Sequence, residues 1–241
     1  ATHYILSAIK KFNNKIKFFF AGSSEMYGNI TSFPQNEKTA FNPLSAYGIS
    51  KVAAYHLVKS YRHNFNFLGS TGILFNHESP RRGFEFVTRK ITSTLAEIHA
   101  GRKKILELGN IYAKRDWGYA GDFVEGIWKM IQKDKPRDYV LATGEEHSVK
   151  EFATLAAKLT GFNLVWKGKK FNEYAVDKDT KKIIIKKNMG YYRPSDVSKL
   201  KGDPREAINN LNWKPKVKFK DLVKIMVESD KKRSLIGKIL Q

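Results

Sequence analysis

Two side chains on one predicted helix have the types and the spacing needed for proton transfer. Tyr47 and Lys51 stand four residues apart in the segment Tyr-Gly-Ile-Ser-Lys, so a helix places them on one face, about one turn apart. A phenol is a poor base at neutral pH, and an adjacent ammonium group favours its phenolate form. The pair is therefore a candidate general base. A packed tyrosine beside a solvated lysine fits the same spacing.

A hydroxyl and a carboxylate follow an apolar run that predicts a strand over 16–21. They belong to Ser23 and Glu25, in the segment Ala-Gly-Ser-Ser-Glu. Reactive groups of α/β folds gather at the carboxyl ends of parallel strands. Ser23 can donate a hydrogen bond to a developing oxyanion or a leaving hydroxyl, and Glu25 can move a proton. A plain turn at the strand exit would also be rich in glycine and serine.

A third polar segment, Asn-His-Glu-Ser-Pro-Arg-Arg-Gly over 76–83, follows a buried strand predicted over 68–75. Its two arginines, beside a proline, suit phosphate oxygens. No second histidine lies at ligand spacing from His77, so we predict no metal site. A structural interface loop is the alternative. Two further loops also present an arginine, Arg115 and Arg193.

Strand and helix patterns alternate along the chain, which predicts an α/β fold with a mostly parallel sheet. Helices are expected from Tyr4 to Phe12 and over 45–63, 85–99, 148–159, 204–211 and 220–232, and further strands over 140–143 and 164–166. After residue 160 the segments become short and rich in lysine and asparagine.

Composition limits the class of protein. The 241 residues are 41% hydrophobic and contain no cysteine, which excludes disulfides and favours the cytoplasm. No apolar run is long enough to span a membrane. The net charge of +21 is spread along the chain. We interpret the lysine cluster over 167–187 as solvated surface and expect neither nucleic acid nor membrane as a partner, although a basic binding module is an alternative.

The motifs together resemble one enzyme family. Ser-Ser-Glu after a strand, Tyr-x-x-x-Lys on the next helix, Asn-His-Glu-Ser-Pro-Arg-Arg-Gly and Ala-Lys-Arg-Asp-Trp-Gly are similar to the GDP-mannose 4,6-dehydratases, members of the extended short-chain dehydrogenase/reductase group. The likeness runs from the first helix to about residue 229. The Tyr-x-x-x-Lys step indicates only the broad group, whereas the two longer segments indicate the dehydratases.

The resemblance implies a role for each motif residue. Tyr47 would take the C4 hydroxyl proton, Lys51 would support it and hold the nicotinamide ribose, and Glu25 with Ser23 would expel the 6-hydroxyl as water. The cofactor would be NADP and the substrate GDP-mannose. The remaining residues match binding positions: His77 and Arg82 for the cofactor, and Asn76, Lys90, Asn110, Arg115, Arg193 and Asp196 for the GDP moiety. A serine stands at 23 where threonine is expected, and an aspartate at 196 where glutamate is expected.

The resemblance also implies the architecture. Residues 1–100 would form the C-terminal part of a Rossmann-like, doubly wound parallel sheet with the catalytic residues. Residues 101–241 would form mainly a smaller α/β lobe for the sugar nucleotide, interleaved with the core. The sequence contains no Gly-x-Gly-x-x-Gly loop to hold a pyrophosphate and no initiator methionine. We therefore expect a fragment without the first βαβ units, inactive alone, of a protein that forms dimers or tetramers. A related nucleotide-sugar dehydratase or epimerase is the nearest alternative.

Overall fold

The computed structural model describes residues 1–192 and 200–237, which form two compact units. Unit 1 comprises 1–77, 116–146 and 200–216, and unit 2 comprises 78–115, 147–192 and the part from 217 onward. The chain enters unit 2 at Glu78, ahead of the boundary expected near residue 100, and returns twice to unit 1. The assignment of one part to the cofactor and the other to the sugar nucleotide remains a prediction.

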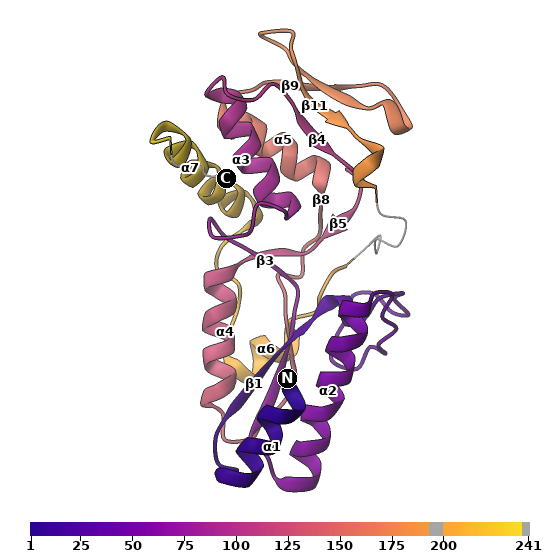
Figure 1. Cartoon of the computed structure of the whole chain (residues 1–241), viewed down its shortest axis with the longest axis vertical. Coiled ribbons are helices and arrows are strands. Elements are labelled where there is room, and N and C mark those ends of the chain that lie inside the picture. The colour runs from indigo at the N-terminus through magenta and orange to yellow at the C-terminus, as the bar shows by residue number, and fades with distance from the viewer. Residues whose placement is uncertain (193–199, 238–241) are drawn as a thin grey trace. The chain divides into compact units, whose positions relative to one another are not determined.

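Unit 1 is a parallel sheet with helices on both faces (Figure 1). Its strands lie in the order β1-β2-β7, and both neighbouring pairs are parallel. Helix α2, with α1 beside it, covers one face, and α4 and α6 cover the other. The elements are α1 (Thr2–Phe12), β1 (Phe18–Ser23), the 3-10 turn η1 (Ser24–Met26), α2 (Ala46–Phe65), β2 (Gly69–Leu74), the paired β3 (Asn76–Glu78) and β6 (Trp117–Tyr119), α4 (Ala120–Gln132), β7 (Tyr139–Leu141) and α6 (Arg205–Leu211).

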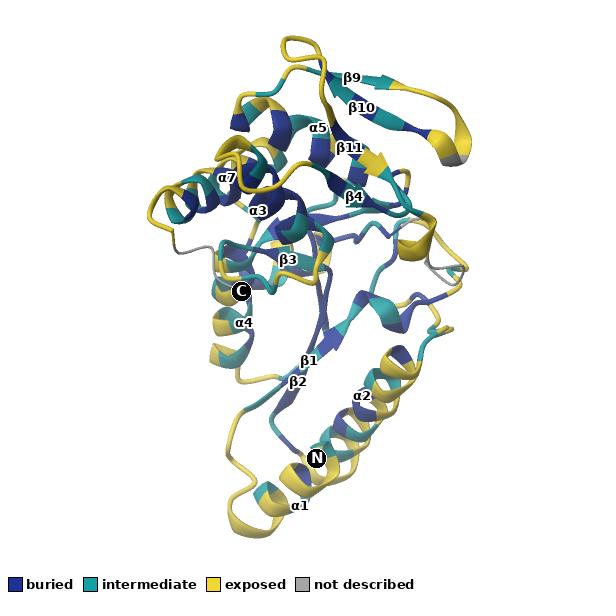
Figure 2. Ribbon diagram, turned by 45° about the horizontal axis from the view of Figure 1, so that its top comes forward, coloured by how far each residue is buried: buried dark blue, intermediate teal, exposed yellow. Residues whose placement is uncertain are grey.

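The apolar run in β1 supplies both layers of this core. Phe18 and Phe20 pack with α1 and α2, whereas Phe19 and Ala21 pack on the α4 side. This alternation follows from the two-residue side-chain period of a strand. In Figure 2 β2 is buried along its length and β1 is partly buried, whereas the outward faces of α1 and α2 are exposed.

The two edges of the unit 1 sheet differ. At β7 the Glu37 carboxylate accepts a 2.6 Å hydrogen bond from the Val140 backbone NH, which covers that edge. Strand β1 pairs only with β2 among the described strands. Because the Phe18 NH bonds to the Leu68 carbonyl, the backbone groups of Phe19 and Ala21 face the other way. Apart from the Ala21 carbonyl, which accepts a hydrogen bond from Lys51, this edge of β1 pairs with no other strand that the structure describes.

Unit 2 packs three helices with a mixed sheet. Its strands lie in the order β4-β11-β10-β9, of which β4 and β11 are parallel and the other pairs antiparallel. The elements are α3 (Val87–His99), β4 (Leu106–Leu108), the paired β5 (Lys114–Arg115) and β8 (His147–Ser148), α5 (Val149–Thr160), β9 (Leu164–Lys167), η2 (Lys170–Asn172), β10 (Tyr174–Asp177), β11 (Ile183–Lys187), η3 (Met189–Tyr191) and α7 (Phe219–Leu235).

The expected helices appear within a few residues of their predicted bounds. Ser45 and Ser148 cap α2 and α5, and Ser148 forms a capping box with Glu151. The sequence patterns did not predict α4, whose Gly121 and Gly126 weaken the helical signal. They also missed the hairpin of β10 and β11 in the lysine-rich region. No described helix has the length and apolar character required to cross a bilayer.

Candidate active site

The predicted proton-transfer residues gather where β1 ends and α2 begins. Ser23 is the last residue of β1 and the N-cap of η1, and its Oγ accepts a 3.2 Å hydrogen bond from the Glu25 NH. Tyr47 lies in the first turn of α2 and is 54% exposed, so its phenol is open to a ligand. The Lys51 Nζ lies 5.4 Å from the centre of the Tyr47 ring. The structure therefore brings the tyrosine and the lysine together on one face of α2, as their spacing predicts.

Lys51 also joins α2 to the sheet. Its ammonium donates a 2.9 Å hydrogen bond to the Ala21 carbonyl, which faces the open edge of β1. This contact fixes the charge next to the strand end that carries Ser23. A lysine so placed can serve a ligand bound at the carboxyl end of the strand.

Gly48 is a residue of this site that sequence reasoning missed. A Cβ at this position would lie 2.7 Å from the Glu25 carbonyl oxygen and 3.0 Å from the Pro43 Cβ. Only glycine allows the first turn of α2 to approach the Glu25 segment so closely. The glycine directly after Tyr47 was the available signal, because a glycine inside a helix needs a reason.

His77 is held in a single orientation. Its Nδ1 lies 2.9 Å from the Phe75 carbonyl, so this nitrogen carries the proton and donates it. The ring stacks on Phe123 with centroids 5.2 Å apart. Asn76, the other predicted ligand residue here, begins β3.

In unit 2 the loop that carries Arg82 is fixed by buried charges. The Arg82 Nε lies 3.3 Å from the Glu78 carboxylate, and its guanidinium covers the Phe86 ring at 3.5 Å. Burial raises the pKa of the Glu78 carboxyl, while the charge of Arg82 and a hydrogen bond from Thr88 oppose the shift. Arg89 donates from Nη1 to the Pro80 carbonyl at 2.5 Å and to the Arg82 carbonyl at 3.1 Å.

Arg89 is in turn held by Asp230 of α7. The Arg89 Nη2 and an Asp230 carboxylate oxygen are 2.8 Å apart, and the two side chains are 3% and 0% exposed. Thr92 donates a further hydrogen bond of 2.7 Å to this carboxylate. Burial raises the pKa of Asp230, and the Thr92 hydrogen bond and the charge of Arg89 oppose the rise. This network, which sequence patterns did not reveal, sets the backbone of the Arg82 loop.

The predicted GDP-binding residues occupy several elements of unit 2. The Lys90 Nζ lies 3.4 Å above the Tyr191 ring, and burial lowers the pKa of this lysine. The Asn110 side chain accepts a hydrogen bond from the Tyr112 NH. Arg115 lies in β5 opposite His147 of β8. Arg193 and Asp196 lie outside the described residues.

Asp116, next to Arg115 in the chain, is a buried carboxylate that the sequence did not single out. It is 0% exposed and accepts hydrogen bonds from the backbone NH groups of Thr143, Gly144 and Gly202 and from the Thr143 hydroxyl. Burial raises the pKa of this carboxyl to about 6, although these hydrogen bonds act in the opposite direction. Asp116 joins the segments after β7 and before α6. Within the described residues no group of His, Asp and Glu side chains forms a metal site.

Comparison with known proteins shows the family of the chain. The family model described as GDP-mannose 4,6 dehydratase matches residues 1–226. The chain belongs to the GDP-mannose 4,6-dehydratase family. It is 48% identical to the GDP-mannose 4,6 dehydratase of Cricetulus griseus and 47% identical to that of Homo sapiens, in each case over 94% of this chain. It spans 61% of the length of each of these relatives. The resemblance predicted from the motifs is confirmed.

Solved structures show the same fold. RMD from Pseudomonas aeruginosa, in complex with NADPH, has a TM-score of 0.81 at 19% identity over 96% of this chain and 72% of its own. The dTDP-glucose 4,6-dehydratase of Bacillus anthracis, in complex with NAD, has a TM-score of 0.79 at 19% identity over 97% of this chain and 67% of its own. At these identities the likeness shows the fold, and it confirms the predicted Rossmann-like α/β class.

Proposed function

We propose that this chain carries the catalytic residues of a GDP-mannose 4,6-dehydratase that uses NADP. The observation that supports it most is the arrangement of Tyr47 and Lys51 beside the strand end that carries Ser23 and Glu25. Family membership and the names of the relatives support the choice of substrate. The NADPH complex of a protein with this fold supports the choice of cofactor.

Each residue then has one task in the reaction. The Tyr47 phenolate takes the proton of the C4 hydroxyl, and the Lys51 ammonium stabilises that phenolate. Bound NADP supplies the chemistry of accepting hydride from C4 and returning it to C6. Because the C4 ketone acidifies C5, the Glu25 carboxylate removes the C5 proton and passes it to the 6-hydroxyl, which leaves as water with a hydrogen bond from Ser23. C5 takes up a proton when C6 receives the hydride, and the proton that Tyr47 took from the C4 hydroxyl balances this uptake. The product is GDP-4-keto-6-deoxymannose.

The residues of this chain fit only part of an NADP site. Lys51, His77 and Arg82 are proposed to hold the nicotinamide end and neighbouring groups. The pyrophosphate needs a glycine-rich turn at a helix N-terminus, and the sequence holds no such motif. We therefore propose that the activity requires a further segment, present in the longer relatives, which pairs with the open edge of β1. Lys90, Asn110, Arg115, Arg193 and Asp196 are proposed to bind the GDP moiety, with Asn76.

Two measurements test the proposal. The chain alone should turn over no GDP-mannose and bind NADP poorly, whereas a fusion with the segment that the human relative has and this chain lacks should release the 4-keto-6-deoxy product. The Tyr47→Phe fusion is the matched control and should be inactive. A fusion that binds NADP but returns a C4 epimer would identify an epimerase instead. If the unfused chain released product, this would contradict the proposal that part of the NADP site lies on a further segment.

We also propose that the full protein forms an oligomer in the cytoplasm. Tyr4 and Phe12 of α1 are 78% and 79% exposed, which supports burial of this face in a dimer or tetramer. Light scattering of the fused protein tests the assembly. The lack of cysteine supports a cytoplasmic location.

A further inference from the structure

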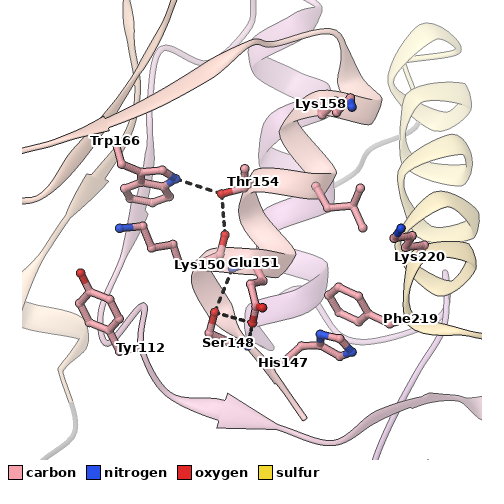
Figure 3. Close-up of a pocket in the computed structure, with 11 residues that line it drawn as sticks. Tyr112, His147, Ser148, Lys150, Glu151, Thr154, Lys158, Trp166, Phe219 and Lys220 are labelled. Atoms are coloured by element: carbon pink, nitrogen blue, oxygen red, sulfur yellow. Dashed lines mark hydrogen bonds between the residues drawn. The ribbon is translucent and has the colours of Figure 1, made fainter. Parts of the chain in front are cut away.

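The surface of α5 in unit 2 carries a pocket of about 620 Å³. Figure 3 shows Tyr112 and Trp166 on one side of the helix, and His147, Phe219 and Lys220 on the other. Ser148, Lys150, Glu151, Thr154, Leu155 and Lys158 of the α5 segment complete the lining. Of the predicted substrate residues that the structure describes, none lines this pocket.

The aromatic side chains that line the pocket are held in place by hydrogen bonds and ring stacking, although they do not belong to the buried core. The Trp166 indole NH donates a 2.9 Å hydrogen bond to the Thr154 Oγ1, and the Tyr112 hydroxyl donates one of 2.5 Å to Glu173. The rings of His147 and Phe219 stack with centroids 3.7 Å apart. Tyr112 is 54% exposed. Fixed, partly exposed aromatic surfaces lower the entropy cost of binding a flat ring.

The rim of the pocket is cationic. Lys158 and Lys220 are exposed, and the structure gives neither amino group an ion pair within the described part of the chain. Glu151 keeps its negative charge, but its carboxylate accepts hydrogen bonds from the Ser148 NH and hydroxyl and forms no ion pair with either lysine in the described part of the chain. Lys150 is already paired with Glu173 at 3.2 Å. The ammonium groups of Lys158 and Lys220 are therefore open to an anionic ligand.

The volume of the pocket fits a small molecule and not a protein partner. Small-molecule sites enclose roughly 300–1,000 Å³, whereas a stable protein partner covers about 800 Å² of surface. A ligand that joins a flat ring to an anionic group suits this lining, and a phosphate monoester is such an anion at neutral pH. We propose that this pocket binds a nucleoside phosphate, whose base lies against the aromatic wall at Trp166 and whose phosphate lies between Lys158 and Lys220.

The site can be tested on the chain itself, and the test does not depend on the proposed enzymatic activity. GMP, guanosine and inorganic phosphate are titrated by calorimetry, and the Trp166 indole NH signal is followed by NMR. GMP should bind with a Kd below about 1 mM and shift that signal. Guanosine and phosphate should each bind at least about tenfold more weakly, because each lacks half of the recognised groups.

Variants locate the site. Lys158→Ala with Lys220→Ala should weaken GMP binding by at least about tenfold, and Trp166→Leu should weaken GMP but not phosphate. Lys178→Ala with Lys182→Ala removes the same charge from exposed positions elsewhere in unit 2 and should change nothing. Arg115→Ala tests whether the Trp166 signal responds to ligand bound at the proposed GDP site. If GMP binds at the pocket, this variant should leave the GMP-induced Trp166 shift intact. Three results would each overturn the proposal. The two double-lysine variants could bind GMP equally well, GMP and phosphate could bind with equal affinity, or GMP could leave the Trp166 signal unshifted.

Discussion

Replacing Asp230 by alanine removes the partner of a charge that cannot reach water. The Arg89 side chain is 3% exposed, and its Nε and Nη2 both contact the Asp230 carboxylate at 2.8–3.0 Å. A buried charge left without its partner typically destabilises a protein by about 3–5 kcal/mol. The two loop carbonyls that Arg89 also contacts do not neutralise it. We expect Asp230→Ala to lower the free energy of unfolding of unit 2 by about this amount.

The same helix offers a matched control. Glu228 and Lys224 form an ion pair of 3.8 Å whose side chains are 64% and 59% exposed. Such pairs contribute only about 0.3–0.5 kcal/mol, so Glu228→Ala should have little effect. Urea unfolding followed by circular dichroism gives the two free energies, and hydrogen exchange of α3 and α7 shows whether the loss lies in unit 2.

A double-variant cycle measures the interaction between Arg89 and Asp230 apart from the contacts that each makes with other residues. Arg89→Met combined with Asp230→Leu removes both charges and leaves apolar side chains, which is often far less costly than removing one partner. The double variant should therefore be more stable than the sum of the single changes predicts. Exchange should still accelerate in the Arg82 loop, because the Pro80 and Arg82 carbonyls lose the Arg89 donor. If Asp230→Ala were no more destabilising than Glu228→Ala, the reasoning from burial would be refuted.

Four further predictions concern the proposed site. In the fused enzyme Glu25→Gln should abolish water loss while C4 oxidation still occurs, seen as NADPH absorbance without product; normal turnover would exclude this role. Gly48→Ala should slow turnover and cost about 1–3 kcal/mol in urea unfolding, because its Cβ would lie 2.7 Å from the Glu25 carbonyl oxygen. Arg115→Ala should weaken GDP binding by roughly ten- to a hundredfold in calorimetry, with NADP binding unchanged; an unchanged GDP affinity would refute the placement. The folded-state pKa of Asp116, about 6, lies above the ordinary value of 3.8, so the folded state binds this proton more tightly. The wild type should therefore gain up to roughly 3 kcal/mol over Asp116→Asn as the pH falls from 7 to 4, and parallel pH profiles in urea unfolding would contradict the raised pKa.

The sequence by itself determined the features that depend on neighbours along the chain. The caps Ser45 and Ser148 each accept a hydrogen bond from a backbone NH three residues away, so they locate α2 and α5 from local chemistry. The spacing of Tyr47 and Lys51 needs only a helix to bring the pair together. The apolar runs of β1 and β2 likewise indicate buried parallel strands.

Only the tertiary structure decided the contacts that join distant segments. Arg89 and Asp230 are 141 residues apart, and no local pattern distinguishes this pair from the many other charged residues of a basic chain. The four hydrogen bonds to Asp116 come from segments that meet only after folding. β10 and β11 were missed because they are short and separated by a lysine-rich turn, and because Ala175, Ile184 and Ile185 become buried only in the folded unit. Burial and long-range pairing depend on which surfaces meet, and propensity and spacing carry no information about that choice.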